Sequence, residues 1–153
     1  ASNAGDDVLR LMKERGVAIC PTLAASEAMA RYNGWKPGDP DHPRIIAAKA
    51  MFKRALRSGA TIACGSDAGA FSHGDNAREI ELMTEYGMSP TQALRAATVV
   101  AAEVLSKGDT WGKVTEGYAA DLIALRANPL RDITALRSPV VVIKTGRIAT
   151  DHR

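Results

Sequence analysis

Aromatic residues, cysteines and histidines are all scarce in this sequence of 153 residues. Aromatic side chains make up 5% of it, and it has two cysteines and three histidines. Cys20 and Cys64 lack the spacing of a metal-binding pair, and each lies in an apolar run. We therefore expect two buried, reduced thiols rather than a disulfide.

Long apolar runs and clusters of basic residues are missing as well. No run approaches the length of a membrane span and no signal-peptide pattern is present, so we expect a cytoplasmic protein with no membrane partner. The net charge is +3, with lysine and arginine scattered among acidic residues, as in Arg78-Glu79. We interpret Arg78 and Glu79 as a surface pair, and the scatter speaks against a nucleic-acid partner.

The sequence does contain an alternation of amphipathic helices and short apolar strands. The spacing of apolar residues predicts helices over residues 6–16, 43–58, 76–86, 89–97 and 99–105. Buried strands are predicted over 17–22 and 61–64. A strand, loop, helix and strand in this order favours parallel pairing with a right-handed crossover.

The segment between the two predicted strands is the least regular part of the chain. We interpret residues 23–31 as an Ala-rich turn and residues 32–43, with three prolines and two glycines, as a loop. Tyr32 and Trp35 form either part of a lid over a substrate side chain or a pair of aromatics that packs the loop onto the body. His42 is either solvated or in contact with substrate.

The character of the sequence changes after Gly108, where short β-rich pieces alternate with glycine and proline. We expect an α/β body over residues 5–108 and a small β module over residues 109–153. The body is taken to begin at residue 5, because Ser2-Asn3-Ala4 resembles an expression-vector remnant. Asp121, which opens a predicted strand of the β module, is expected to be structural.

The most informative stretch is Gly65-Ser66-Asp67-Ala68-Gly69, followed by His73-Gly74. A carboxylate at the C-terminal end of a buried strand lies where α/β enzymes keep catalytic groups. Asp67 is therefore a candidate catalytic residue, and the alternative is an aspartate that only forms a turn. His73 either lines a substrate site beside Asp67 or binds its own backbone. Ser66 is not a nucleophile, because Gly-x-Ser-x-Gly is absent.

Several motifs, taken in order, resemble the C-terminal part of the amidohydrolase superfamily. They are Gly65-Ser66-Asp67-Ala68-Gly69, His73-Gly74, residues 88–98, Gly112-Lys113-Val114, Gly117, Ala120-Asp121-Leu122, Asn128-Pro129-Leu130 and residues 142–147. The chain is most similar to the imidazolonepropionase-like amidohydrolases, which include Xaa-Pro dipeptidases. The resemblance extends over nearly the whole chain, from Asp6 onward.

This resemblance implies a (β/α)8 barrel, a TIM-like barrel, that holds one or two divalent metal ions, usually zinc. Residues 17–22 and 61–67 would be its strands seven and eight, so the chain would supply the last two βα units of the barrel. The β module would be part of a composite β-sandwich, completed by strands from the N-terminal part of such an enzyme.

The resemblance also implies that Asp67 binds the metal and takes the proton from the attacking water. The family's other ligands are a His-x-His on strand one, a lysine or acid on strand four, and histidines on strands five and six, and none has a match here. The chain resembles the last quarter to third of a hydrolase that cleaves C–N bonds in a small amide or dipeptide. By itself it is not expected to retain the metal.

A second hypothesis is a catalytically incomplete fragment that acts only as a structural or oligomerising piece. Two parallel strands with open edges and half of a sandwich leave backbone groups and apolar faces without partners. Such a chain is expected to form homo-oligomers, or to associate through its exposed strand edges.

Overall fold

The computed structural model describes residues 5–153, and the remnant predicted at residues 2–4 lies outside the described residues. The described part contains six α-helices, one 3-10 helix and three strands. They are α1 (Asp6–Glu14), α2 (Leu23–Tyr32), α3 (Pro43–Ser58), α4 (Ala77–Glu85), α5 (Pro90–Ala97), α6 (Val99–Val104), β1 (Leu122–Ala124), η1 (Ile133–Arg137), β2 (Val141–Lys144) and β3 (Arg147–Asp151).

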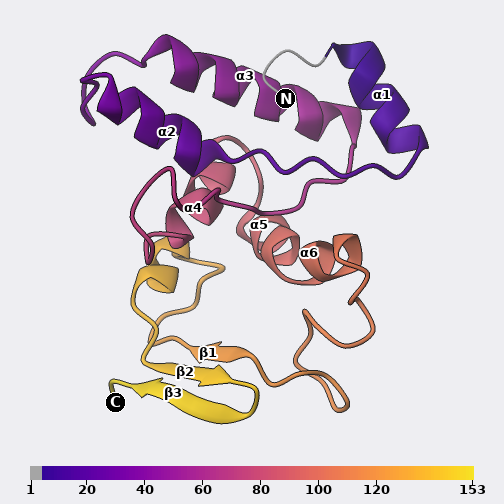
Figure 1. Cartoon of the computed structure of the whole chain (residues 1–153), viewed down its shortest axis with the longest axis vertical. Helices are drawn as coiled ribbons and strands as arrows, with labels where there is room; N and C mark the ends of the chain where they lie inside the picture. Colours follow the sequence, from indigo (N-terminus) through magenta and orange to yellow (C-terminus); the bar gives the residue numbers. More distant parts are fainter. Residues whose placement is uncertain (1–4) are drawn as a thin grey trace.

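These elements form three layers, which are seen edge-on in Figure 1. Helices α1, α2 and α3 lie together at one end, α4, α5 and α6 lie beneath them, and the sheet forms the other end. Helix α2 packs against both α3 and α4, and α4 in turn packs against η1. The chain is thus an α/β fold with a small antiparallel sheet. Within residues 5–153, no helix has the length and apolar character needed to span a membrane.

The two predicted parallel strands meet at a single bridge, between Ile19 and Ile62. The N–H of Ile19 donates to the carbonyl of Thr61 at 2.8 Å, and the N–H of Ala63 donates to the carbonyl of Ile19 at 2.9 Å. The parallel direction is confirmed, but the predicted lengths of the strands were wrong. The next donor in this parallel ladder would be the N–H of residue 21, and Pro21 has none, so the pairing ends there.

Helix α2 replaces the Ala-rich turn that the sequence analysis predicted, so that prediction was wrong. Alanine has the highest helix propensity of all residues, and its small side chain lets α2 pack closely against its neighbours. The buried residues of α2 are Leu23, Ala24, Ala25, Glu27, Ala28 and Ala30. Tertiary packing therefore stabilises a helix here, and the irregular loop is confined to residues 33–42.

Two helix starts follow the sequence signals closely. Pro43 is the first residue of α3, where its missing N–H has no intrahelical partner to lose. Ser89 caps α5 with a complete capping box, in which the Ser89 hydroxyl accepts the Gln92 N–H and the Gln92 side chain accepts the Ser89 N–H. Asn76 precedes α4 as predicted, although its side chain makes no capping hydrogen bond.

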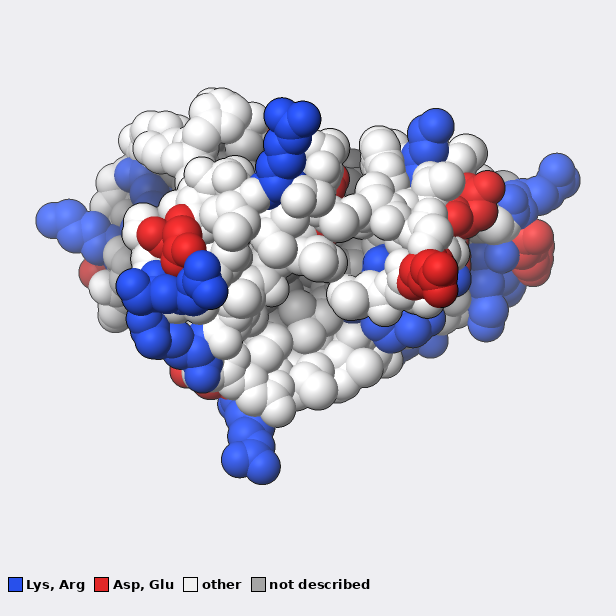
Figure 2. Space-filling model, turned by 90° about the horizontal axis from the view of Figure 1, so that it is seen from below, with Lys and Arg blue, Asp and Glu red and all other residues white. Residues whose placement is uncertain are grey.

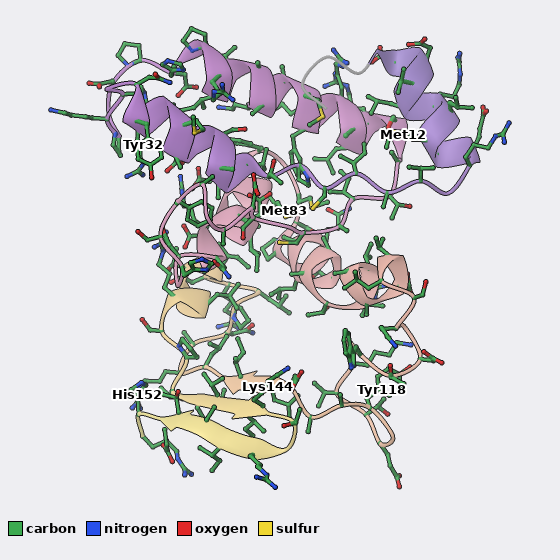
Figure 3. The ribbon with its side chains drawn as sticks, viewed as in Figure 1. Met12, Tyr32, Met83, Tyr118, Lys144 and His152 are labelled. Carbon is green, nitrogen blue, oxygen red and sulfur yellow. The ribbon has the colours of Figure 1, made fainter. Side chains whose placement is uncertain are left out.

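The hydrophobic core lies between the two helical layers and is centred on Phe52 of α3. Phe52 is fully buried, and its ring meets the Tyr86 ring edge to face, with the centroids 6.4 Å apart. Met83 of α4 is also fully buried and lies where the upper and middle layers meet (Figure 3). Ile19 and Ile62 belong to the same core, so the parallel bridge is packed against the helices.

The C-terminal strands form an antiparallel sheet in the order β1-β2-β3. A tight turn at Thr145-Gly146 joins β2 to β3, and both residues have the positive φ, 50° and 76°, that a type I′ hairpin turn requires. Asp121 accepts the Thr145 N–H at 2.7 Å and also binds the Lys144 ammonium group. Asp121 therefore ties the start of β1 to this turn, which confirms its predicted structural role.

Two of the predicted β-rich pieces are not strands. Trp111 and Val114 lie in a segment of turns that precedes β1. Residues 133–137 form η1, because the Asp132 carboxylate accepts the Thr134 N–H at 3.0 Å and so starts a helical turn.

Candidate functional site

Asp67 lies in the loop between the second parallel segment and α4. Its φ is 56°, in the left-handed region that aspartate enters more readily than most residues. The Asp67 carbonyl accepts the Ala70 N–H at 3.1 Å, which closes a turn. The residue thus forms a turn through its backbone and exposes its carboxylate to solvent. Its role as a metal ligand stays a prediction.

The ends of the two parallel segments touch at Cys20 and Gly65. A Cβ atom at position 65 would overlap the Cys20 Sγ, so any residue other than glycine would require the Cys20 side chain to move. Partial burial, followed by the negative charges of Glu79 and Asp67, raises the pKa of the Cys20 thiol. The Asp67 loop and the end of the first segment are therefore electrostatic neighbours.

The prediction of two buried thiols was wrong for Cys20, which is exposed, and Cys64 is only partly buried. Side chains alternate along an extended chain, so Cys20 points away from the core that its neighbour Ile19 faces. The prediction of reduced cysteines is confirmed, since neither cysteine is in a disulfide.

Glu79 is buried, so its interpretation as half of a surface pair was wrong. Its side chain is 0% exposed, and its two carboxylate oxygens accept the N–H groups of Leu23 at 3.0 Å and Ala24 at 2.6 Å. Burial raises the pKa of Glu79 to about 7, although both N–H groups favour the charged form. The signal that was missed is helical spacing, because Glu79 shares one face of α4 with Leu82 and Met83.

Arg78 joins three carboxylates and is likewise not part of a simple surface pair. Its guanidinium donates to Glu27 at 2.7 Å, to Glu85 at 2.6 Å and to Glu81 at 3.1 Å. Glu27 and Glu81 are buried, and Glu81 also binds Arg137 of η1. We call Glu27, Arg78, Glu81 and Arg137 the ion network. It connects α2, α4 and η1, and so links the helical layers to the segment that leads into β2.

The ion network and Glu79 respond to pH in opposite ways. Burial alone would raise the pKa values of Glu27 and Glu81, but their arginine partners outweigh it and lower both. Glu27 and Glu81 therefore stabilise the fold above about pH 4.5, and that stability is lost as the pH falls. Glu79 binds its proton more tightly in the folded state, so its contribution declines as the pH rises from 4.5 to about 7.

We expect the free energy of unfolding to be greatest near pH 5 and to fall by about 2 kcal/mol on the way to pH 7. Urea unfolding at a series of pH values measures this. In Glu79→Gln, which cannot ionise, the decline between pH 5 and pH 7 is expected to disappear. A decline of the same size in this variant would contradict the assignment to Glu79.

The loop over residues 33–42 is held by its own contacts. The Trp35 indole N–H donates to the Pro40 carbonyl at 3.1 Å, and the Arg31 guanidinium lies 6.0 Å from the Trp35 ring centroid. Tyr32, in contrast, is 72% exposed at the end of α2 (Figure 3). Trp35 thus takes part in the packing of the loop, which agrees with the second of the two predicted alternatives. Tyr32 contributes no such packing.

His42 has a role that neither of its predicted alternatives described. It is the residue before α3, and its Nδ1 accepts the Arg44 N–H at 3.2 Å, which caps the helix. It also lines a cavity of about 570 Å³ at the end of the first parallel segment, together with Cys20, Thr22, Asn33 and Arg44. A cavity of this size is in the range of small-molecule sites.

His73 is exposed in the same loop as Asp67 and precedes Gly74, whose φ is 101°. Contact between His73 and a substrate stays a prediction. The alternative of a histidine bound to its own backbone likewise stays a prediction.

A metal ion needs more ligands than this part of the chain brings together. Within residues 5–153, no three histidine, cysteine, aspartate or glutamate side chains are close enough to hold one. A catalytic zinc site normally takes three protein ligands and keeps one open position. These residues therefore do not form a complete metal site.

The helical layers, the parallel bridge and the small antiparallel sheet define an α/β protein. The family model described as the amidohydrolase family matches residues 2–149. The chain belongs to the amidohydrolase family, as the sequence motifs indicated.

Relatives of known name agree with this membership. The chain is 33% identical over 147 residues to ochratoxinase from Aspergillus niger, a match that covers 92% of this chain and 30% of that protein. It is 32% identical over 134 residues to imidazolonepropionase from Deinococcus deserti, over 84% of this chain and 32% of that protein.

Among solved structures, the chain is similar to a Xaa-Pro dipeptidase with bound methionine in its active site. The TM-score is 0.87 and the identity 33%, over 98% of this chain and 38% of the dipeptidase. The chain thus spans only about a third of the length of the relatives that it matches.

Proposed function

We propose that this chain is the C-terminal part of a metal-dependent amidohydrolase that cleaves C–N bonds in small amide or dipeptide substrates. Membership of the amidohydrolase family supports the reaction class. Similarity to a Xaa-Pro dipeptidase supports a dipeptide or a related small amide as the substrate. The two cysteines, neither of them in a disulfide, are consistent with the predicted cytoplasmic location.

In this proposal, residues 5–108 provide the last two βα units of a TIM-like barrel, and residues 109–153 provide part of a composite β-sandwich. The parallel bridge between Ile19 and Ile62 supports the first assignment, because neighbouring barrel strands are parallel. The antiparallel sheet β1-β2-β3 supports the second.

The observation that carries the proposal is the position of Asp67. Its exposed carboxylate follows the second of two parallel segments by a few residues, and TIM barrels keep their catalytic groups at that end of the strands. Asp67 would be one ligand of a divalent metal, proposed to be zinc, which when bound supplies Lewis acidity toward the scissile carbonyl. The Asp67 carboxylate would accept the proton of the attacking water, and His73, in the same loop, would contact the substrate.

A hybrid enzyme tests the role of Asp67, with residues 5–153 in place of the matching segment of the Xaa-Pro dipeptidase. We expect the hybrid to bind zinc, measured by elemental analysis after dialysis, and Asp67→Asn to weaken its affinity for zinc by roughly 10- to 100-fold. Asp75→Asn is the matched control, because Asp75 is an exposed carboxylate of the same loop and asparagine can still accept the hydrogen bond from Arg137. Equal zinc affinity in all three proteins would contradict the assignment of Asp67.

The second candidate function is a structural or oligomerising piece without catalysis. Two observations favour it: no ligand set for a metal is complete within residues 5–153, and large apolar side chains are exposed on several elements. Those on the helices and loops include Val8, Leu11, Val17, Ile46, Val104, Leu105 and Val114. Figure 2, seen from the sheet end, shows a largely uncharged centre with acidic and basic residues around its edge.

Oligomer formation by the chain alone tests the second candidate. We expect the 153-residue chain to associate, because exposed apolar surface and open strand edges favour contacts between copies. Multi-angle light scattering over a range of concentrations measures this association. A stable monomer at high concentration would contradict the oligomerising function, and tight stoichiometric zinc in the chain alone would contradict its incompleteness.

A further inference from the structure

Helix α2 begins without a cap from its own sequence. Thr22, the residue before it, has φ 49° and ψ 52°, and its side chain makes no capping hydrogen bond. The first N–H groups of a helix have no intrahelical partner, and those of Leu23 and Ala24 belong to buried residues. These donors therefore need a partner from elsewhere in the fold.

Glu79 is that partner, although it is more than fifty residues away in sequence. One of its oxygens accepts the Leu23 N–H at 3.0 Å and the other accepts the Ala24 N–H at 2.6 Å. Both oxygens are used, and the positive end of the helix dipole favours a carboxylate there. A local cap from serine, threonine or asparagine normally needs an extended backbone before the helix, and Thr22 is left-handed, so its own hydroxyl does not replace Glu79.

The contact made by Glu79 joins the ends of the two parallel segments. Helix α2 directly follows Cys20-Pro21-Thr22, the end of the first segment, and α4 follows the loop that holds Asp67 and His73. The Cys20 thiol senses the charges of both Glu79 and Asp67. The partly buried Cys64 thiol, at the end of the second segment, senses the charge of Glu79 as well.

We propose that Glu79 is a positioning residue, which fixes the start of α2 against α4 and so holds the end of the first segment beside the Asp67 loop. Its importance for catalysis rests on the proposed function, but the contact itself does not. Loss of the carboxylate would let Cys20-Pro21-Thr22 move away from the loop. Asp67 would then lose its fixed position relative to that segment.

Cys20 provides a readout of this position in the 153-residue chain itself. Iodoacetamide alkylation of Cys20, followed by peptide mass spectrometry between pH 7 and pH 10, reports how much of its thiol is ionised. Asp67→Asn is expected to speed alkylation at pH 8 by roughly threefold or more, because it removes a negative charge near the thiol. In a Glu79→Gln background the same substitution is expected to change the rate little, since Asp67 is no longer held near Cys20.

Amide hydrogen exchange measures the cap in the same proteins. Glu79→Gln is expected to speed exchange at Leu23 and Ala24 by roughly tenfold or more. Glu85→Gln is the control, because Glu85 lies on the same helix but is exposed. If Glu79→Gln does not fold, Glu79→Asp is used in its place, since the shorter side chain keeps the carboxylate but does not reach both N–H groups.

An equal effect of Asp67→Asn with and without Glu79 would overturn the positioning role, because a mere helix cap would leave the Asp67 loop in place. Unchanged exchange at Leu23 and Ala24 would overturn it as well. Neither result depends on metal or hydrolysis. The proposed function fails instead if Asp67→Asn leaves the zinc affinity of the hybrid enzyme unchanged.

Discussion

Replacing Arg78 with methionine is expected to lower the free energy of unfolding by about 3 kcal/mol at pH 7. Methionine keeps much of the side-chain volume but removes every hydrogen bond of the guanidinium. The buried carboxylates of Glu27 and Glu81 then each lose one of their two arginine partners, and removing a partner from a buried charge is costly. Urea unfolding of both proteins measures the difference.

The dependence of this loss on pH identifies its cause. The deficit of Arg78→Met is expected to shrink toward pH 4, because Glu27 and Glu81, each with one arginine partner fewer, can then take up protons and lose their buried charge. Arg31→Met is the matched control, since the half-exposed Arg31 also pairs with Glu27 but is expected to contribute less than about 1 kcal/mol. Equal losses in the two variants would contradict the ion network.

Phe52→Ala is expected to lower the free energy of unfolding by about 3 to 4 kcal/mol. The Phe52 side chain is fully buried at the centre of the core and meets the Tyr86 ring edge to face. Its removal loses both the transfer free energy of the ring and the packing around the cavity that remains. Chemical unfolding at pH 5, where Glu79 does not complicate the comparison, measures the loss.

Ile46→Ala provides the control for Phe52→Ala on the same helix. Ile46 is exposed, so its truncation is expected to cost less than about 1 kcal/mol. If the two substitutions were equally harmful, the core would not be centred on Phe52. If neither had an effect, the burial of the core face of α3 would be wrong.

Local sequence signals predicted the starts of several helices, because contacts between neighbouring residues determine where a helix begins. The capping box at Ser89 and the first position of Pro43 need only neighbouring residues, and both were predicted correctly. Helix α2 was missed because its buried alanines gain from tertiary packing that the pattern does not contain. The parallel direction at Ile19 and Ile62 followed from the order of elements, whereas the extent of the pairing did not.

In the candidate site, too, features set by neighbouring residues were predicted and features set by distant contacts were missed. Asp67 was singled out because a carboxylate after an apolar strand is a local pattern, and its exposure in a turn is compatible with that role. Glu79 and Arg78 were misjudged, since their burial depends on contacts with Leu23, Ala24 and Glu27 more than fifty residues away. A charged residue at the spacing of a core face is the signal that would have revealed Glu79.

Hydrolysis of a Xaa-Pro dipeptide by the hybrid enzyme tests the central claim most directly. The hybrid that carries residues 5–153 is expected to hydrolyse the dipeptide, and Asp67→Asn to reduce its kcat/KM by about 1000-fold or more while Asp75→Asn leaves it within about threefold. A hybrid that folds and hydrolyses the dipeptide equally well with asparagine at position 67 would contradict the assignment of Asp67 to the catalytic site.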